Sequence, residues 1–120
     1  MPKPALTLLF LAALATTLSG CAMIDRMSGV EETRRLQEVG IAATARIVEV
    51  WDTGMTVNDD PVIGLRVEVS RADGSVYAAT IAKSLVSRIH IPQFQPGSIV
   101  PVRIDPQDAA NVALDFYRYR

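Results

Sequence analysis

The sequence predicts a mainly β protein: a small five-stranded, twisted antiparallel sheet or a partly open barrel, OB-like or SH3-like, with a short N-terminal helix. Two observations predict this fold. Stretches with apolar side chains at every second position recur between residues 41 and 116, which is the period of a strand with one buried face. Turn-forming Gly, Pro, Asp and Asn residues separate these stretches. Curling hides the strand edges of so small a sheet. A sheet packed by one helix is the alternative.

A short helix is expected just before the strands. Ser28 and Glu31 fit a capping box, in which the Ser and Glu side chains satisfy free amide groups at the helix start. The helix then continues to Val39 and ends at Gly40. Its apolar stripe is thin, so its charged side is expected to face solvent or, alternatively, to bind a partner.

Three strands are expected next, over residues 43–51, 62–71 and 76–82. Residues 43–51 are rich in β-formers, but the alternation fails from Ile47 to Trp51, which predicts a bulge or two-sided burial. Residues 62–71 alternate cleanly, and Asp73-Gly74 marks a tight turn because Gly tolerates positive φ. Residues 76–82 return as the partner strand, so a hairpin is predicted here.

A single helical turn is expected over residues 83–90. Leu85, Val86 and Ile89 would face inward, and Pro92 would end the turn. Residues 95–98 then place Pro and Gly where a type II turn requires them.

The last two strands are expected over residues 99–104 and 111–116, with a turn at 105–108. Pro101 lacks an amide donor, which predicts that the first of these strands lies at a sheet edge or is bulged at that residue. Phe116 is expected in the core.

The first twenty residues differ in kind from the rest. Lys3 supplies a positive charge, residues 5–18 carry none, and the segment ends in small polar residues. This is the layout of a secretory signal peptide. A transmembrane helix is the alternative, but residues 5–20 number only 16, against about 20 needed to span a bilayer. We therefore expect a cleaved signal at residues 1–20, a tether at 21–29 and one small β-rich domain at 30–120.

Leu18-Ser19-Gly20-Cys21 stands at the exit of the apolar run and resembles the lipobox of bacterial lipoproteins. The resemblance implies that a diacylglycerol is attached to the Cys21 thiol and that the signal is cleaved between Gly20 and Cys21. It also implies acylation of the new amino group, as with palmitate. Cys21 is the only cysteine, so it cannot form an internal disulfide. Each buried methylene adds about 0.8 kcal/mol to membrane attachment.

The residues after Cys21 indicate which membrane is expected to hold the lipoprotein. In double-membrane bacteria, lipoprotein sorting resembles a rule in which Asp after the cysteine retains the protein in the inner membrane. Here Ala22 and Met23 follow, which favours the outer membrane, facing the periplasm, over the inner membrane.

The mature body, over roughly residues 40–115, resembles an uncharacterised small β-rich domain of bacterial envelope proteins. The resemblance implies the β fold and brings no catalytic motif. It is carried by Ala43-Thr44-Ala45-Arg46-Ile47, Asp52-Thr53-Gly54, the turn at 58–61, Pro96-Gly97 and Val102-Arg103-Ile104-Asp105-Pro106.

Charge and residue types exclude several function classes. Without Lys3, 11 Lys and Arg face 13 Asp and Glu, a formal charge of −2, so no basic excess favours nucleic acid. His90 is the only histidine, so no multi-histidine metal site can form, and a packed or surface role is expected. No GxSxG surrounds a serine, and lipid consumes Cys21. We expect no catalytic, cofactor-binding or metal-binding residues.

Three weaker candidates have ordinary structural alternatives. Residues 52–60 gather oxygen groups that calcium prefers, although such residues also form turns. Gly54, Gly64 and Gly74 are typical of turns and bulges rather than of a phosphate-binding loop. The tail from Phe116 to Arg120 alternates aromatic and basic residues and could add to a partner's edge or contact anionic sugar or lipid; the finish of a strand is the alternative.

The expected function is that of a membrane-anchored envelope lipoprotein, a non-catalytic interaction or structural module with a possible envelope protein partner. The alternative is a β-barrel that binds a small ligand or glycan, with Trp51 and Tyr77 as wall residues. A hydrolase would require His90 beside a serine and a carboxylate.

Overall fold

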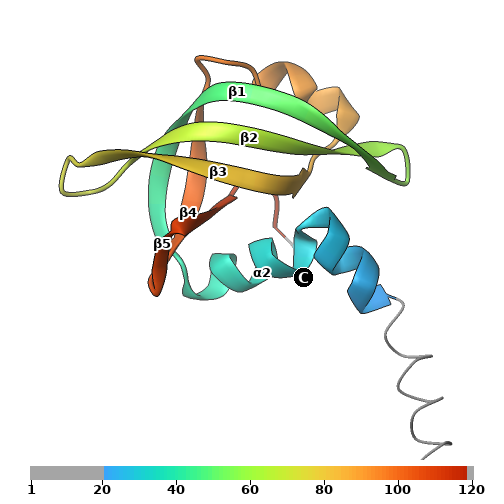
Figure 1. The fold of residues 1–120 in the computed structure, drawn as a ribbon, viewed down its shortest axis with the longest axis horizontal. Coiled ribbons are helices and arrows are strands. Elements are labelled where there is room, and N and C mark those ends of the chain that lie inside the picture. The colour runs from blue at the N-terminus through green and yellow to red at the C-terminus, as the bar shows by residue number, and fades with distance from the viewer. Residues whose placement is uncertain (1–20, 119–120) are drawn as a thin grey trace, which may run out of the picture.

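The computed structural model describes residues 21–118 and shows a mainly β domain (Figure 1). Residues 21–28 are helical and lead into α2. A short helix followed by five strands confirms the predicted fold class. The elements in chain order are α2 (Val30–Val39), β1 (Ile41–Val57), β2 (Asp60–Ser70), β3 (Val76–Leu85), the 3₁₀ helix η1 (Arg88–Gln93), β4 (Ile99–Asp105) and β5 (Asp108–Leu114).

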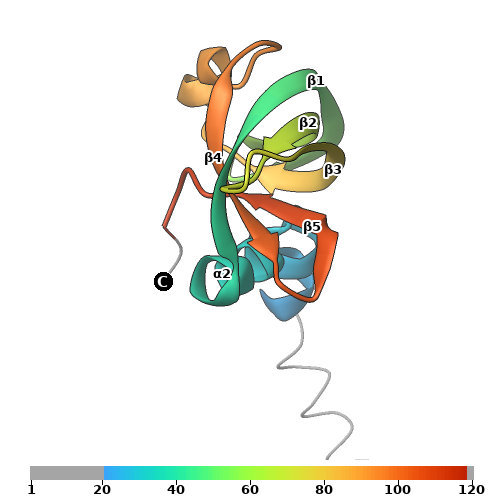
Figure 2. The same ribbon diagram turned by 90° about the vertical axis from the view of Figure 1, so that its left-hand side faces the viewer.

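The five strands form one antiparallel sheet in the order β3-β2-β1-β4-β5. The long β1 pairs with β4 through residues 41–46 and with β2 through residues 44–57. The sheet therefore curls, and the Tyr77 hydroxyl of β3 donates to the Ala109 carbonyl of β5 at 2.6 Å. No ladder joins β3 to β5 within residues 21–118, so the sheet is open and does not close into a barrel (Figure 2).

Strand β1 carries the bulge that its broken alternation predicts. Its register with β2 passes from Ile47–Val67 to Glu49–Arg66, so Val48 is the extra residue. A bulge increases local twist and bends the strand. The bulge at Val48 lies just beyond the part of β1 that pairs with β4, so the bend helps β1 to pair with strands in both halves of the curled sheet.

The interior between the two halves of the sheet is filled by the protein's own side chains. Helix α2 lies against the side where β3 and β5 face each other (Figures 1 and 2), with Leu36 completely buried. The helix thus covers edges that no ladder covers. The core residues are Ala45, Ile47, Ile63, Leu65, Val67, Val69, Ala79, Ile81, Val86, Phe94, Val100, Val102, Ile104, Val112 and Leu114.

The predicted capping box at the start of α2 is wrong. Ser28 ends the helical segment 21–28, and its buried hydroxyl donates to the Asp25 carbonyl at 3.3 Å. The N-cap of α2 is Gly29, in the left-handed region with φ 84°, and no side chain caps the helix. Because the chain is already helical before Ser28, that hydroxyl bonds back to its own helix rather than forward to a free amide.

The predicted helical turn at 83–90 is misplaced. Strand β3 continues to Leu85, because β2 is long enough to pair with it there, and η1 begins only at Arg88 and contains Pro92. Pro is tolerated in so short a helix because few of its amides have an intrahelical partner. Val86 is buried as expected, whereas Ile89 is 78% exposed.

The prediction that Pro101 lies at an edge or bulge is wrong. Its strand, β4, lies between β1 and β5. The Pro101 carbonyl accepts a hydrogen bond from the Asp115 amide at 2.9 Å, so the same residue's nitrogen also points to the β5 side. The β4–β5 ladder ends at Val102–Leu114, and the missing donor therefore falls just outside it.

Candidate functional site

Cys21 lies at the start of the described chain, on the helical segment 21–28, and its thiol is free and exposed. An exposed thiol meets the steric requirement for attachment of a lipid. Gly20, on the other side of the expected cleavage, lies outside the described residues, as does the rest of the expected signal. Within residues 21–118, no helix has the length and apolar character needed to cross a membrane.

A hollow of about 390 Å³ lies at one end of the sheet. The start of β1, the β2–β3 turn and the β4–β5 turn surround it. Apolar residues line it together with four charged residues, which we call its rim: Arg71, Asp73, Asp105 and Asp108.

The charged groups at this rim already have partners in the protein. Asp73 accepts hydrogen bonds from the amide and hydroxyl of Ser75 at 2.9 and 2.6 Å, which lower its pKa. Asp108 accepts from the Ala110 amide at 3.1 Å. The guanidinium of Arg71 lies 4.7 Å from the centre of the Tyr77 ring, a cation–π distance. These groups therefore serve to hold turns and a strand edge.

Asp105 is the centre of a polar cluster that joins α2 to the β4–β5 hairpin. Its carboxylate accepts from Arg35 at 2.7 Å, from the Gln107 amide at 2.9 Å and from Asn111 at 3.1 Å. Arg35 and Asn111 also bond Glu32, at 2.5 and 2.8 Å. We call Glu32, Arg35, Asp105 and Asn111 the polar clamp.

The polar clamp shifts the titration of its own carboxylates. The Gln107 amide, followed by Arg35 and Asn111, holds the pKa of Asp105 below its ordinary value of 3.8. Hydrogen bonds from Arg35 and Asn111 also lower the pKa of Glu32, and Glu32 and Asp105 raise that of Arg35. Each shift favours the charged form of its group in the folded state.

Asp105→Asn should therefore weaken the fold at neutral pH and flatten its response to acid. A carboxyl whose pKa is lowered on folding stabilises the native state above its unfolded pKa, and that contribution disappears as pH falls through the folded pKa. We expect wild-type stability to decline below about pH 4 and the variant to lose less over that range. Urea unfolding at pH 7, 5, 4 and 3 measures both effects.

Asp59→Asn is the matched control, since Asp59 is exposed and its φ of 68° suits Asn equally well. This variant should follow the wild-type pH profile. Identical profiles for the Asp105 and Asp59 variants would contradict a stabilising role for the clamp carboxylate.

The C-terminal tail, as far as residue 118, packs on its own domain. Phe116 meets Phe94 edge to face, with ring centres 4.9 Å apart. The Tyr117 hydroxyl accepts from the Ser87 backbone amide at 2.9 Å and lies 2.8 Å from Nδ1 of His90. The backbone carbonyl of Tyr117 accepts from the side-chain amide of Gln37. Burial raises the pKa of Tyr117. The tail thus finishes the domain rather than standing free, and residues 119–120 lie outside the described part.

His90 occupies a packed, half-buried position, as expected. It stacks on Tyr117 and meets Phe116 edge to face, with ring centres 5.7 and 5.5 Å away. Nδ1 of His90 and the Tyr117 hydroxyl share a hydrogen bond of 2.8 Å, so the partner of this imidazole is a phenol.

Trp51 and Tyr77 do not line a common hollow. Trp51 lies opposite Gly64 on β2, where a Cβ would approach the indole to 2.2 Å. Tyr77 instead bridges β3 to Ala109 of β5. Trp51 is 37% exposed, whereas Tyr77 packs against the hydrophobic core. The absence of a side chain at position 64 is what lets the indole rest on β2.

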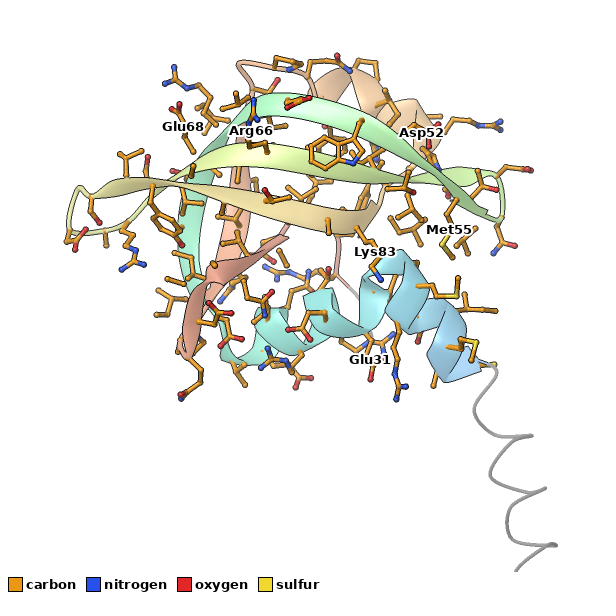
Figure 3. The ribbon with its side chains drawn as sticks, viewed as in Figure 1. Glu31, Asp52, Met55, Arg66, Glu68 and Lys83 are labelled. Carbon is orange, nitrogen blue, oxygen red and sulfur yellow. The ribbon has the colours of Figure 1, made fainter. Side chains whose placement is uncertain are left out.

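The outer face of the sheet carries charges of both signs. Arg46 pairs with Glu68 at 2.9 Å and Arg66 with Glu49 at 3.1 Å, and Figure 3 shows Arg66 and Glu68 on this face. Exposed pairs of this kind contribute about 0–1 kcal/mol each. The sign alternation leaves no basic surface here.

The acidic segment 52–60 comprises the end of β1, the two-residue turn at 58–59 and the first residue of β2. Asp52 accepts from the Gly54 amide at 2.8 Å, and Asp60 accepts from the Arg88 amide at 3.1 Å. Within residues 21–118, no group of three or more His, Cys, Asp or Glu side chains is arranged to hold a metal ion.

Sequence reasoning missed the polar clamp. Arg35 and Asp105 are 70 residues apart, and no local pattern connects them. Comparison with protein-family models, curated proteins and solved structures returns no match for this chain. The candidate site therefore rests on Cys21 and the segment that carries it.

Proposed function

We propose that this protein is an envelope lipoprotein, held at a membrane by lipid on Cys21, and that its β domain is a non-catalytic interaction or structural module. The observation that carries the proposal is the lipobox-like Leu18-Ser19-Gly20-Cys21 at the end of an apolar run. The exposed Cys21 thiol supports it, because acyl chains attached there can enter a bilayer without disturbing the core.

The non-catalytic part of the proposal draws on how the polar groups are used. His90 bonds a tyrosine hydroxyl, and the carboxylates around the hollow at the end of the sheet bond amides, Ser75 and the polar clamp. A nucleophile and general base would need to lie within hydrogen-bond reach of each other. The residues after Cys21, Ala22 and Met23, favour the outer membrane with the domain in the periplasm.

Cys21→Ser should abolish lipid attachment and release the protein from membranes. Bacterial cells that express the full precursor would be fed an alkyne fatty acid, and label would be read on the purified protein. Wild type should be labelled, sediment with membranes and have its mature N-terminus at Cys21. The serine variant should be unlabelled, because a hydroxyl does not replace the thiol as the attacking group.

Ser28→Ala is a control that keeps the thiol and changes a nearby hydroxyl of the same segment; it should label as wild type does. Density fractionation of the wild-type membranes then distinguishes the outer from the inner membrane. An unlabelled wild type, or equal label on the serine variant, would refute the proposal.

A further inference from the structure

The helical segment 21–28 exposes three large apolar side chains. Met23, Ile24 and Met27 are 59%, 51% and 51% exposed. At 3.6 residues per turn, Met27 lies about one turn after both Met23 and Ile24, so the three side chains share one side of the helix. They form one continuous face, which we call the apolar face.

The C-terminal end of the same segment holds it to the domain. Ser28 is buried, and the Lys83 ammonium donates to the Arg26 carbonyl at 3.3 Å. Because its three side chains are more than half exposed, the apolar face is directed into the surroundings. Figure 3 shows Glu31 and Lys83 at the junction of this segment with α2.

The apolar face is close to the proposed lipid. Met27 follows Cys21 by six residues, which at 1.5 Å per residue places it about 9 Å along the helix axis. Helices that lie on membranes bury their apolar side chains about 5–10 Å into the boundary between headgroups and acyl chains. A lipid on Cys21 thus brings all three side chains within reach of that boundary.

We propose that the apolar face lies in the interfacial layer of the same bilayer that holds the Cys21 lipid, so that the domain is oriented and not merely tethered. This inference rests on the proposed function. The helical segment then acts as a second contact beside the acyl chains, and the core, packed behind Ser28 and Gly29, takes a fixed direction relative to the membrane.

The charges around the face indicate that apolar contact, rather than headgroup charge, holds it there. Arg26 pairs with Glu31 at 3.2 Å, and Arg34 lies 3.8 Å from Asp25. With both signs present in pairs, the segment gains little from anionic lipid. The contact should accordingly be insensitive to salt, unlike a contact that depends on basic residues.

The size of the face favours a bilayer over a protein partner. Three half-exposed side chains offer much less than the roughly 800 Å² that each partner buries in a stable protein interface. A bilayer needs no such area, because the lipid on Cys21 already supplies the attachment.

The two methionines of the apolar face make the inference testable on the lipidated protein itself. Thioether oxidation requires access to the aqueous oxidant. The lipidated protein, carrying Ile99→Met, would be placed in phosphatidylethanolamine–phosphatidylglycerol vesicles and exposed to hydrogen peroxide, and oxidation at each methionine followed by mass spectrometry. Ile99 is 66% exposed, at the end of β4 remote from α2, so Met at this position reports an exposed reference site.

We expect oxidation of Met23 and Met27 to be several-fold slower than at position 99 in vesicles, with the same ratio at low and high salt. In the Cys21→Ser protein, free in buffer, the three sites should oxidise at similar rates. Ile24→Asp should remove the protection while the protein stays on the membrane, whereas Ile89→Asp, a matched change at an exposed apolar residue in η1, should keep it.

Failure of the inference differs from failure of the proposed function. A protein that acquires no lipid never reaches the vesicles, and this refutes the function. A lipidated protein whose Met23 and Met27 oxidise as fast as position 99 refutes the docked orientation alone. Protection that depends on protein concentration in the vesicles, or that survives Ile24→Asp, would point to contact between proteins and would equally overturn it.

Discussion

Phe94→Ala is expected to destabilise the domain by about 3–5 kcal/mol. Phe94 is fully buried between η1 and β4, and its ring contacts Phe116 edge to face at 4.9 Å. Truncation removes a large apolar surface, leaves a cavity that the curled sheet cannot collapse, and deprives the tail of its main contact. Domains of this size have a total free energy of unfolding of about 5–15 kcal/mol, so this loss would remove a large part of the stability. Urea unfolding followed by circular dichroism measures the change.

Ile89→Ala is the control for this prediction, because Ile89 lies in the adjacent η1 and is 78% exposed. Its loss should stay within about 0.5 kcal/mol. The tail should also respond differently: in Phe94→Ala the amides of residues 115–118 should exchange with solvent faster than in the Ile89 variant. Equal destabilisation by the two substitutions would mean that Phe94 is not the centre of this end of the core.

The strands with one buried face were predictable because side-chain alternation reports such a face directly. Val67 and Val69 of β2 fall on the inward face as the period of two requires. The turn at Gly74, with φ 88°, was equally predictable from the sequence. The second half of β1 was not predictable, because residues 52–57, which we call the arm, have little core contact on either side of the strand. There the backbone ladder to β2, rather than burial, holds the strand.

The Asn58-Asp59 turn shows what the arm depends on. Both residues have positive φ, 51° and 68°, and link Val57 directly to Asp60, as in a type I′ hairpin turn. Asn and Asp tolerate this conformation better than other residues with side chains. A turn was predicted at 58–61, but its two-residue length, which would have revealed the hairpin, was not.

The parts of the candidate site also differ in how far the sequence predicts them. The proposal for Cys21 comes from adjacent residues, because a processing signal would be recognised along the chain and needs no fold. The polar clamp and the docked tail were not predictable in this way, because Arg35 meets Asp105, and Tyr117 meets Ser87, only after the sheet has curled. The apolar face lay between these cases: Ile24 and Met27 are visible in the sequence, but their exposure depends on how Gly29 turns the chain.

Gly29→Ala should therefore be among the most damaging single changes, at about 2–5 kcal/mol. Two costs add. A side chain at φ 84° is strained, and a Cβ would lie 2.3 Å from the carbonyl oxygen of Lys83. Because that neighbour is backbone of β3, the helix must move away from the sheet and Leu36 loses its packing. Thermal and urea unfolding measure the total.

Gly74→Ala separates the two costs. Gly74 has nearly the same φ, 88°, but nothing lies within 4 Å of a Cβ built there, so this variant carries the strain alone, about 1–2 kcal/mol. The excess of Gly29→Ala over Gly74→Ala then measures how firmly the close approach of helix and β3 is fixed. If that excess is near zero, the helix can shift without loss, and the direction in which segment 21–28 leaves the domain is not set by Gly29. If it is large, one glycine fixes both the closure of the sheet's open side and the orientation of the segment that carries Cys21.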